Sequence, residues 1–332
     1  MRERVKQWRQ KVTSFLEKHI KPQSIQMTIA LSFTIVSVIS MGILGISLYN
    51  RFVNKMEDMT TQSAEQLLNQ TAINLESYLR NMRRISDAMY YSVIKDKDLA
   101  TDSLDEEMNL LYEANKDNLI SIACYTNDGR LVAAAPVATE KNNLDIVDQE
   151  WFTEATGQME NVHFSTPHVQ NLFDDPSYRY YWVVSLSQAV ELTSGGNSTL
   201  GVLLVDMNYS SIEQLLTKAN TDNASEYVYL MDGSGELIYH PKQKLIYTDL
   251  FSENNLVAAS YEDGSHKEEF DGEKRIVTVK TISYTGWKIV SVVPMSSFDM
   301  GISGMRMFVI LLMSLSMLML SLIHISEPTR PY

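Results

Sequence analysis

The sequence of 332 residues has little cysteine and no surplus of positive charge, and each shortage excludes a class of protein. Its one cysteine, Cys124, can form neither an intramolecular disulfide nor a cysteine-based metal site. Because Cys124 lies in the apolar, strand-like run LISIACYT, we expect a buried and unreactive thiol. The 28 Lys and Arg against 41 Asp and Glu leave a net charge of -13, which disfavours a nucleic-acid-binding protein.

The sequence motifs of common enzymes are also missing. The chain has no P-loop, no G-x-S-x-G and no H-E-x-x-H motif. Among its six histidines, His163 and His168 are close in sequence, but their spacing in an expected loop is poor for a metal site. His240, at an expected strand end, suits a structural or solvent-facing role better than catalysis. We therefore expect no enzymatic activity, no cofactor and no bound metal in the chain as given.

An uncharged stretch, residues 25–49, predicts a transmembrane helix, since its 25 residues at about 1.5 Å each can cross a bilayer core of roughly 30 Å. A cleaved signal peptide is the alternative, but no small-x-small cleavage site follows. Residues 1–24 carry a net charge of +5, which places the N-terminus in the cytoplasm by the positive-inside rule. Residues 51–299 carry a net charge of -19, and we expect residues 50–299 outside the cell.

A second apolar stretch, residues 300–323, predicts a return helix. Its uninterrupted apolar part, from Met307 to Ile323, is near the lower length limit for a membrane span, and Arg306 can extend to the interface. We therefore expect a multi-pass protein of the plasma membrane that contacts the lipid bilayer.

The region 50–118 follows the first membrane helix and predicts a long amphipathic stalk helix. Apolar residues recur there in steps of three and four: Leu68, Ala72, Leu75, Leu79, Met82, Met89 and Val93. One such stripe can pack on the protein's own sheets, on a second copy of the helix, or on both at different heights.

Two units with one plan follow the stalk. LISIACYTNDGRLVAAAP, from Leu119, and EYVYLMDGSGELIYHP, from Glu226, both contain an apolar strand, an Asp-Gly turn and a second strand. Each unit then has a later strand pair; in the first the pair is joined by an expected polar loop, ELTSGGN. We name residues 119–220 the distal module and residues 221–299 the proximal module. A helix over 208–219, with Ser210 and Ser211 as expected caps, closes the distal module.

This arrangement resembles the double Cache extracellular sensor, whose modules are PAS-like, over about residues 50–299. The motifs that carry the resemblance are DGRLVAAAP, GSGELIYHP and TGWKIVSVVP, and the stalk string NLESYLRNMRRISDAMYYS resembles YesM-type two-component sensor histidine kinases. The resemblance implies an α+β fold: a long N-terminal stalk helix and two tandem antiparallel-sheet modules, flanked by two transmembrane helices.

The resemblance also implies a ligand pocket in the distal module. Double Cache sensors that bind amino acids share an R-x-W-Y pattern and a later Asp that binds the ligand amine. In DQEWF, Trp151 matches the Trp, Phe152 replaces the Tyr and Gln149 replaces the Arg, while Asp206 matches the later Asp. Without the Arg, a ligand carboxylate loses a charged partner worth about 1.5–3 kcal/mol, so a standard amino acid is not expected to bind.

The residues themselves indicate the same place. Tyr180 and Trp182 are expected on one strand face, and His168 in a loop across the mouth of a pocket between the central sheet and residues 143–173. The alternative is that Trp151 and Trp182 are core residues and Asp206 caps the next helix. The predicted ligand-binding residues are Trp151, Asp206, Trp182, His168, Tyr180 and Gln149. In the proximal module the matching stretches, KQKLIYTDLFSENN and YEDGSHKEEFDGEK, predict solvated loops without an aromatic cleft, and a role in transmission.

The end of the chain, residues 320–332, fits no structural plan. LSLIHISEPTR matches the in-frame translation of a transposase adapter used in DNA sequencing libraries, so we expect the natural chain to continue into a cytoplasmic output domain. The resemblance implies a receptor that binds an extracellular small molecule, acts as a homodimer and signals through a histidine kinase to a response regulator. Alternative functions are the sensor part of a methyl-accepting chemotaxis receptor or of a diguanylate cyclase. An alternative from another class is an extracellular enzyme or adhesion module tethered to the membrane.

Overall fold

The computed structural model describes residues 25–326 except 138, 142–143, 158–161, 175–178 and 221–225. The predicted cytoplasmic segment 1–24 and the end of the adapter-like string, residues 327–332, lie outside the described residues. The chain divides into two compact units, one made of Met1–Met59 with Phe298–Tyr332 and the other of Thr60–Ser297.

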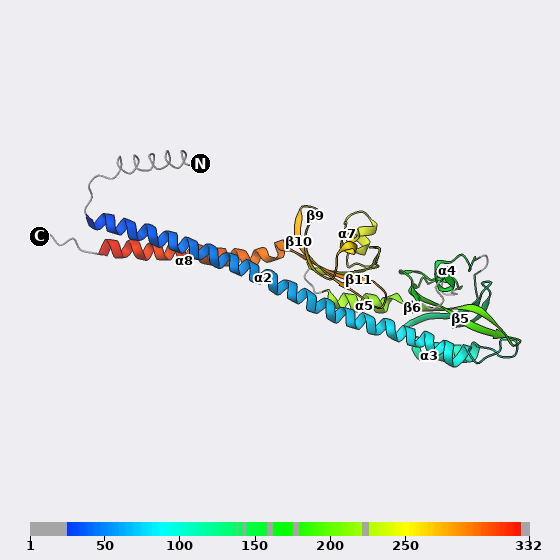
Figure 1. Cartoon of the computed structure of the whole chain (residues 1–332). Helices are drawn as coiled ribbons and strands as arrows, with labels where there is room; N and C mark the ends of the chain where they lie inside the picture. Colours follow the sequence, from blue (N-terminus) through cyan, green and yellow to red (C-terminus); the bar gives the residue numbers. More distant parts are fainter. Residues whose placement is uncertain are drawn as a thin grey trace, which may run out of the picture. The chain divides into compact units, whose positions relative to one another are not determined.

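The first unit contains the start of helix α2 (Ile25–Ala88) and helix α8 (Asp299–Ser326) (Figure 1). Among the described residues, α2 provides the one candidate membrane span, and its apolar side chains there are exposed, with Phe33 69% and Leu44 61% accessible. Such exposure is what a lipid-facing helix presents. In α8, Ser303–Ser316 form a shorter apolar segment. Gly45 permits close helix packing, because a Cβ there would lie 2.9 Å from Cγ1 of Val309.

The stalk continues α2 through a π-helical turn, η1 (Met89–Ile94), to helix α3 (Asp105–Asn115). Its predicted apolar stripe is buried and forms one core with residues of both sheets. Packing of the stalk on the protein's own sheets is therefore confirmed, and pairing with a second copy stays a prediction.

The distal module holds an antiparallel sheet in the order β2-β1-β6-β5-β3, with β4 also paired to β5. Its strands are β1 (Leu119–Thr126), β2 (Leu131–Ala135), β3 (His163–Phe164), β4 (His168–Val169), β5 (Trp182–Ser194) and β6 (Asn197–Asn208). The prediction that ELTSGGN forms a loop is wrong for most of its residues. Strands β5 and β6 continue to Ser194 and from Asn197, which leaves a two-residue turn. Gly195 and Gly196 there have φ of 58° and 77°, which glycine adopts without strain.

The proximal module repeats this order as β8-β7-β11-β10-β9, which confirms the predicted repeat. Its strands are β7 (Tyr227–Met231), β8 (Leu237–Tyr239), β9 (Gly264–Phe270), β10 (Glu273–Thr281) and β11 (Lys288–Pro294). Short helices α6 (Gln243–Tyr247), α7 (Asn255–Ser260) and η2 (Met295–Phe298) complete it. The prediction of solvated loops is wrong for most of these residues, since β9 and part of β10 occupy the acidic stretch.

Helix α5 (Tyr209–Ala219) joins the two modules. Its N-cap is Asn208, whose side chain accepts a hydrogen bond from the Ser210 backbone N–H, so the prediction that Ser210 and Ser211 cap the helix is wrong. The modules also touch through aromatic rings: Phe164 of β3 lies 5.7 Å from Tyr284 and 6.3 Å from Trp287, centroid to centroid.

Both sheets have one face on the stalk core and one face covered by their own segments. In the distal module the covering elements include helix α4 (Glu150–Gly157), which contributes Trp151 and Phe152 to a separate apolar cluster. In the proximal module the cluster contains Tyr227, Tyr229 and Ala258 of α7. Residues alternate between the two faces along each strand, and a cavity lies against each covered face.

Candidate ligand-binding site

Buried polar side chains interrupt the apolar covered face of the distal sheet, namely those of Ser121, Ser185, Ser187 and Asp206, and three of them meet. Asp206 of β6 is paired in register with Ser121 of β1 on one side and with Ser185 of β5 on the other. Cross-strand partners project from the same face of a sheet, so the three side chains meet. All three are at least 95% buried.

Asp206 accepts a hydrogen bond from each neighbour, from Ser121 Oγ at 2.6 Å and from Ser185 Oγ at 2.5 Å. Burial raises the pKa of Asp206, and the two hydroxyl hydrogen bonds and the charge of His168 oppose the rise without cancelling it. A carboxylate removed from water is costly unless charge and hydrogen bonds compensate it. Because Asp206 contacts these serines and Asn208 caps α5, the alternative role of Asp206 as a helix cap is excluded.

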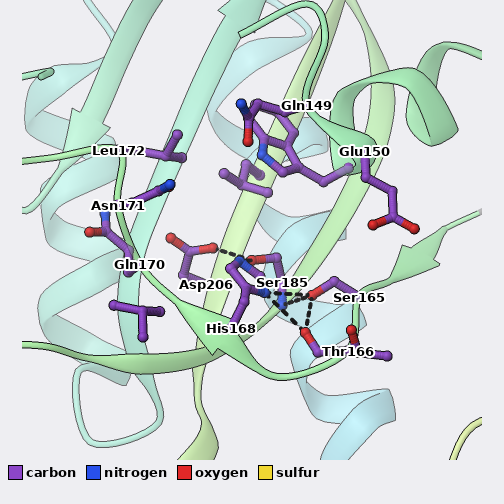
Figure 2. Close-up of a pocket in the computed structure, with 13 residues that line it drawn as sticks. Gln149, Glu150, Ser165, Thr166, His168, Gln170, Asn171, Leu172, Ser185 and Asp206 are labelled. Carbon is purple, nitrogen blue, oxygen red and sulfur yellow. Dashed lines mark hydrogen bonds between the residues drawn. The ribbon is translucent and has the colours of Figure 1, made fainter. Parts of the chain in front are cut away.

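His168 extends the polar group toward solvent. Its Nε2 lies 3.3 Å from Ser185 Oγ, and its Nδ1 lies 3.0 Å from the carbonyl oxygen of Thr166 (Figure 2). The neighbouring Ser165 hydroxyl accepts the backbone N–H of Ser185 at 2.9 Å. Residues 165–167 are thereby held against β5, with the imidazole beside Asp206. The expectation that His168 lies in a loop is wrong, because it begins β4 and pairs with Val183 of β5.

A cavity of about 270 Å³ opens above this group. Four predicted site residues line it: Gln149, Trp151, His168 and Asp206. The first two lie at the start of α4, where Trp151 is 6% exposed and packs on Tyr125 with ring centroids 5.4 Å apart. Trp151 is thus both a core residue and a wall of the cavity. That these residues bind a ligand stays a prediction.

Tyr180 and Trp182 do not line this cavity. Tyr180 precedes β5 and is 85% exposed, while Trp182 begins β5, is 48% exposed and lies 6.5 Å from the Tyr209 ring. The prediction that they share a strand face is wrong, because β5 begins at Trp182 and Tyr180 lies before the strand.

Sequence reasoning missed several residues of the cavity. They are Glu150, Ser165, Thr166, Gln170, Asn171 and Ser185, with Ser121 bonded beneath. Ser185 could have been noticed, because VVSLS places a hydroxyl group within an apolar strand. The sequence does not tell which strand pairs with it, and so which residues it meets. The polar residues of the loop carried no such signal.

The covered face of the proximal sheet also holds aromatic and charged residues. His240 is buried against Tyr227, Tyr229 and Phe251, and its Nε2 lies 3.4 Å from Glu253 Oε2. This corrects the expectation that the proximal module lacks an aromatic cleft, and it excludes the solvent-facing alternative for His240. The segment that carries Phe251 folds back over the sheet, which its polar composition did not indicate.

Comparison with known proteins agrees with this architecture. The family model of the Cache domain matches residues 52–301. A probable methyl-accepting chemotaxis protein of Bacillus thuringiensis is 23% identical over 292 residues, which are 84% of this chain and 40% of that protein. The chain spans about 40% of the length of the curated relatives it matches.

Solved structures of chemoreceptor ligand-binding domains share the fold. The domain of the Pseudomonas aeruginosa amino acid chemoreceptor PctC, in complex with GABA, aligns with a TM-score of 0.54 and 17% identity over 70% of this chain and 99% of that domain. The domain of PctB from the same organism, in complex with L-Arg, aligns with a TM-score of 0.56 and 16% identity over 75% and 93% of the two chains.

Proposed function

Because the chain belongs to the Cache domain family, we propose that it is the sensory part of a membrane receptor and that its distal module binds a small extracellular solute. The observation that carries the proposal is a buried carboxylate, Asp206, at the floor of a cavity. Polar groups that converge on a concave pocket, together with apolar walls such as Trp151 and Leu204, are what a small-molecule site requires.

The charges around the cavity favour a solute with an ammonium group. Of the described residues that line it, none is Lys or Arg, whereas Asp206 and Glu150 are acidic. An ammonium group would compensate the negative charge of the buried Asp206 carboxylate, and its N–H groups can donate hydrogen bonds to the carboxylate oxygens. The solved relatives hold GABA and L-Arg, which both carry an ammonium group.

The other end of the solute meets neutral partners. Gln149, Gln170 and Asn171 line the cavity, and their amides can donate to or accept from a carbonyl or hydroxyl group. A free carboxylate would meet no Lys or Arg among the described residues that line the cavity and would lie near Glu150 and Asp206. The proposed class is therefore a small amine with a neutral polar end, in place of a standard amino acid.

The test compares 4-aminobutanamide with GABA, which differ only in an amide or carboxylate end, by calorimetry on the full chain in lipid nanodiscs. We expect the amide to bind at least about tenfold more tightly, and Asp206→Asn to weaken it by about tenfold or more. Asp148→Asn, an exposed aspartate beside the cavity, is the matched control and should change nothing. Tighter binding of GABA, or binding that survives Asp206→Asn, would refute the proposal.

For the output of the receptor we propose a methyl-accepting chemotaxis module. The support is that the matched curated relatives are chemotaxis proteins. A histidine kinase output, with a response regulator as partner, is the second candidate and rests on the stalk string NLESYLRNMRRISDAMYYS. Reading the gene beyond residue 320 in an independent assembly decides between a methyl-accepting coiled coil and a HAMP linker followed by a kinase.

We also propose that both apolar helices cross the plasma membrane, with the N-terminus in the cytoplasm and residues 50–299 outside. The charge difference between residues 1–24 and 51–299 supports this orientation. A reporter fused after Tyr49 should be active only outside the cytoplasm, and the reverse result would contradict the proposal.

A further inference from the structure

The proximal module contains a cavity that the function proposed above does not use. Its volume is about 570 Å³, larger than that of the distal cavity. The floor consists of strand residues, among them Tyr227, Arg275 and Val292, and the segment 249–252 forms part of the wall. A cleft of this size on the covered face of a sheet can hold a small molecule.

Two aromatic rings form a corner in this cavity. The rings of Tyr227 and Phe251 lie 6.3 Å apart, centroid to centroid, at an angle of 76°. The ammonium of Lys242 lies in the corner, 5.1 Å from the centroid of Tyr227 and 4.6 Å from that of Phe251. Aromatic faces carry negative charge density and attract cations within about 6 Å. The corner therefore already holds a positively charged group, supplied by the chain itself.

The charges around the corner also favour a cation. Asp249, Asp271 and Glu273 line the cavity. Arg275, the other cation there, is paired with Glu253 at 2.7 Å and with Glu268 at 2.5 Å, so its charge is compensated. No carboxylate among the described residues is within ion-pair distance of the Lys242 ammonium, which leaves the rings as its partners.

The Tyr227 side of the corner is fixed by the residues behind it. Tyr227 donates a hydrogen bond to Glu253 Oε2 at 2.5 Å, and Glu253 is fixed in turn by Arg275. Lys242 is anchored only through its backbone, whose N–H donates to Nδ1 of His240 at 3.0 Å. Its half-buried side chain has a flexible four-carbon stem, so the ammonium can leave the corner while the rings stay in place.

We propose that this corner is a second ligand site, for a quaternary ammonium compound, and that Lys242 occupies it when no ligand is bound. Ring faces attract a cation without needing an N–H donor, and methyl groups on nitrogen add apolar contact. This chemistry differs from that of the distal cavity, where the Asp206 carboxylate and its serines suit an ammonium with N–H groups. The two sites would thus respond to different classes of cation.

The test uses choline and its uncharged analogue of the same shape, 3,3-dimethyl-1-butanol, with the full chain in lipid nanodiscs. Because a bound cation must displace the lysine ammonium, Lys242→Ala should strengthen choline binding by about tenfold. Lys244→Ala, an exposed lysine two residues away that contacts neither ring, is the matched control and should leave the affinity unchanged. The uncharged analogue should bind at least about tenfold more weakly than choline.

A further variant locates the site. Phe251→Leu in the Lys242→Ala background keeps apolar bulk and removes one ring, and it should reverse the gain in choline affinity; thermal unfolding checks that this variant is folded. Choline binding that Lys242→Ala leaves unchanged or weakens overturns the proposal, as does equal binding of the uncharged analogue. Binding that is lost in Asp206→Asn but unaffected by Lys242→Ala places choline in the distal cavity and also overturns it.

Discussion

The two modules have the same strand order and the same covered sheet face, but they treat buried charge differently. In the distal module, Asp206 is neutralised by no Lys or Arg among the described residues and is held by hydroxyl groups. In the proximal module, Glu253 and Glu268 pair with Arg275 within the protein. A buried charge that is paired internally is already compensated, whereas an uncompensated one favours a ligand that brings the missing charge.

The pKa values express the same difference. Burial raises the pKa of Glu253, but hydrogen bonds from His240 and Tyr227 and the charge of Arg275 outweigh it and lower the value to about 2. Burial also raises the pKa of Asp206, and there the hydrogen bonds from Ser121 and Ser185 do not reverse the rise. The pKa values of the two carboxylates thus shift in opposite directions, because Glu253 has hydrogen bonds from His240 and Tyr227 and the charge of Arg275, whereas Asp206 has mainly two serine hydroxyl groups.

The largest effect on stability is expected from Arg275→Met, which removes the internal ion pairs of the proximal module. The variant leaves Glu253 and Glu268 buried without their cation, and we expect the free energy of unfolding to fall by about 3–5 kcal/mol. Urea unfolding followed by tryptophan fluorescence measures the loss. Lys274→Met, the exposed lysine next to it on β10, is the control and should cost less than about 0.5 kcal/mol. A loss below about 1 kcal/mol in Arg275→Met would show that the proximal ion pairs do not stabilise the fold.

The pH dependence of stability sharpens the comparison at a smaller scale. Because the folded-state pKa of Asp206 is raised, its contribution to stability is present below the unfolded value of 3.8 and is lost as the pH rises through the folded value. Glu253, with a lowered pKa, contributes above its unfolded value of 4.5 and loses that contribution as the pH falls toward 2.

Asp206→Asn should therefore remove the decline in ligand-free stability that the wild-type chain shows as the pH rises above 3.8. Glu253→Gln should leave this decline in place and lose stability that the wild-type chain has above pH 4.5. Unfolding curves at several pH values measure both. A wild-type decline that persists in Asp206→Asn would contradict the assignment to this carboxylate.

The smallest effect is expected at Trp182, a predicted site residue that the structure places outside the distal cavity. Trp182→Ala should change the affinity for 4-aminobutanamide by less than about twofold, because the residue is half exposed and does not line the cavity. Trp151→Phe, at a residue that does line it, is the comparison and should weaken binding by more than about threefold. An equal loss in both variants would extend the site toward Trp182.

Much of the fold was predictable from local patterns. The stalk helix, the repeated modules and their hairpins follow from apolar periodicity and from Asp-Gly turns, which depend on neighbouring residues only. The errors came where local signals were weak: the strand β5 begins at Trp182 and continues to Ser194, past the expected loop, and Asn208 caps α5 ahead of two serines.

The candidate site was predictable in part. Trp151, His168 and Asp206 were found through a family pattern and through aromatic content, and they line one cavity. Tyr180 and Trp182 satisfied the same criteria but lie elsewhere, because Tyr180 precedes β5 and Trp182 is on the strand face of Val184 and Leu186, opposite Asp206. The proximal aromatic corner was missed since its rings, Tyr227 and Phe251, come from a strand and from a segment that reads as polar.

By itself the sequence determined the class of the protein: acidic, poor in cysteine, with an apolar N-terminal helix, a stalk and two antiparallel modules. These properties depend on composition and on periodicity over a few residues. Only the tertiary structure decided the chemistry of the two cavities, because Ser121 and Asp206 are 85 residues apart in sequence and Tyr227 and Arg275 are 48 apart. The register between distant strands brings such groups together. It therefore decides whether a buried charge is paired within the protein or is left for a ligand.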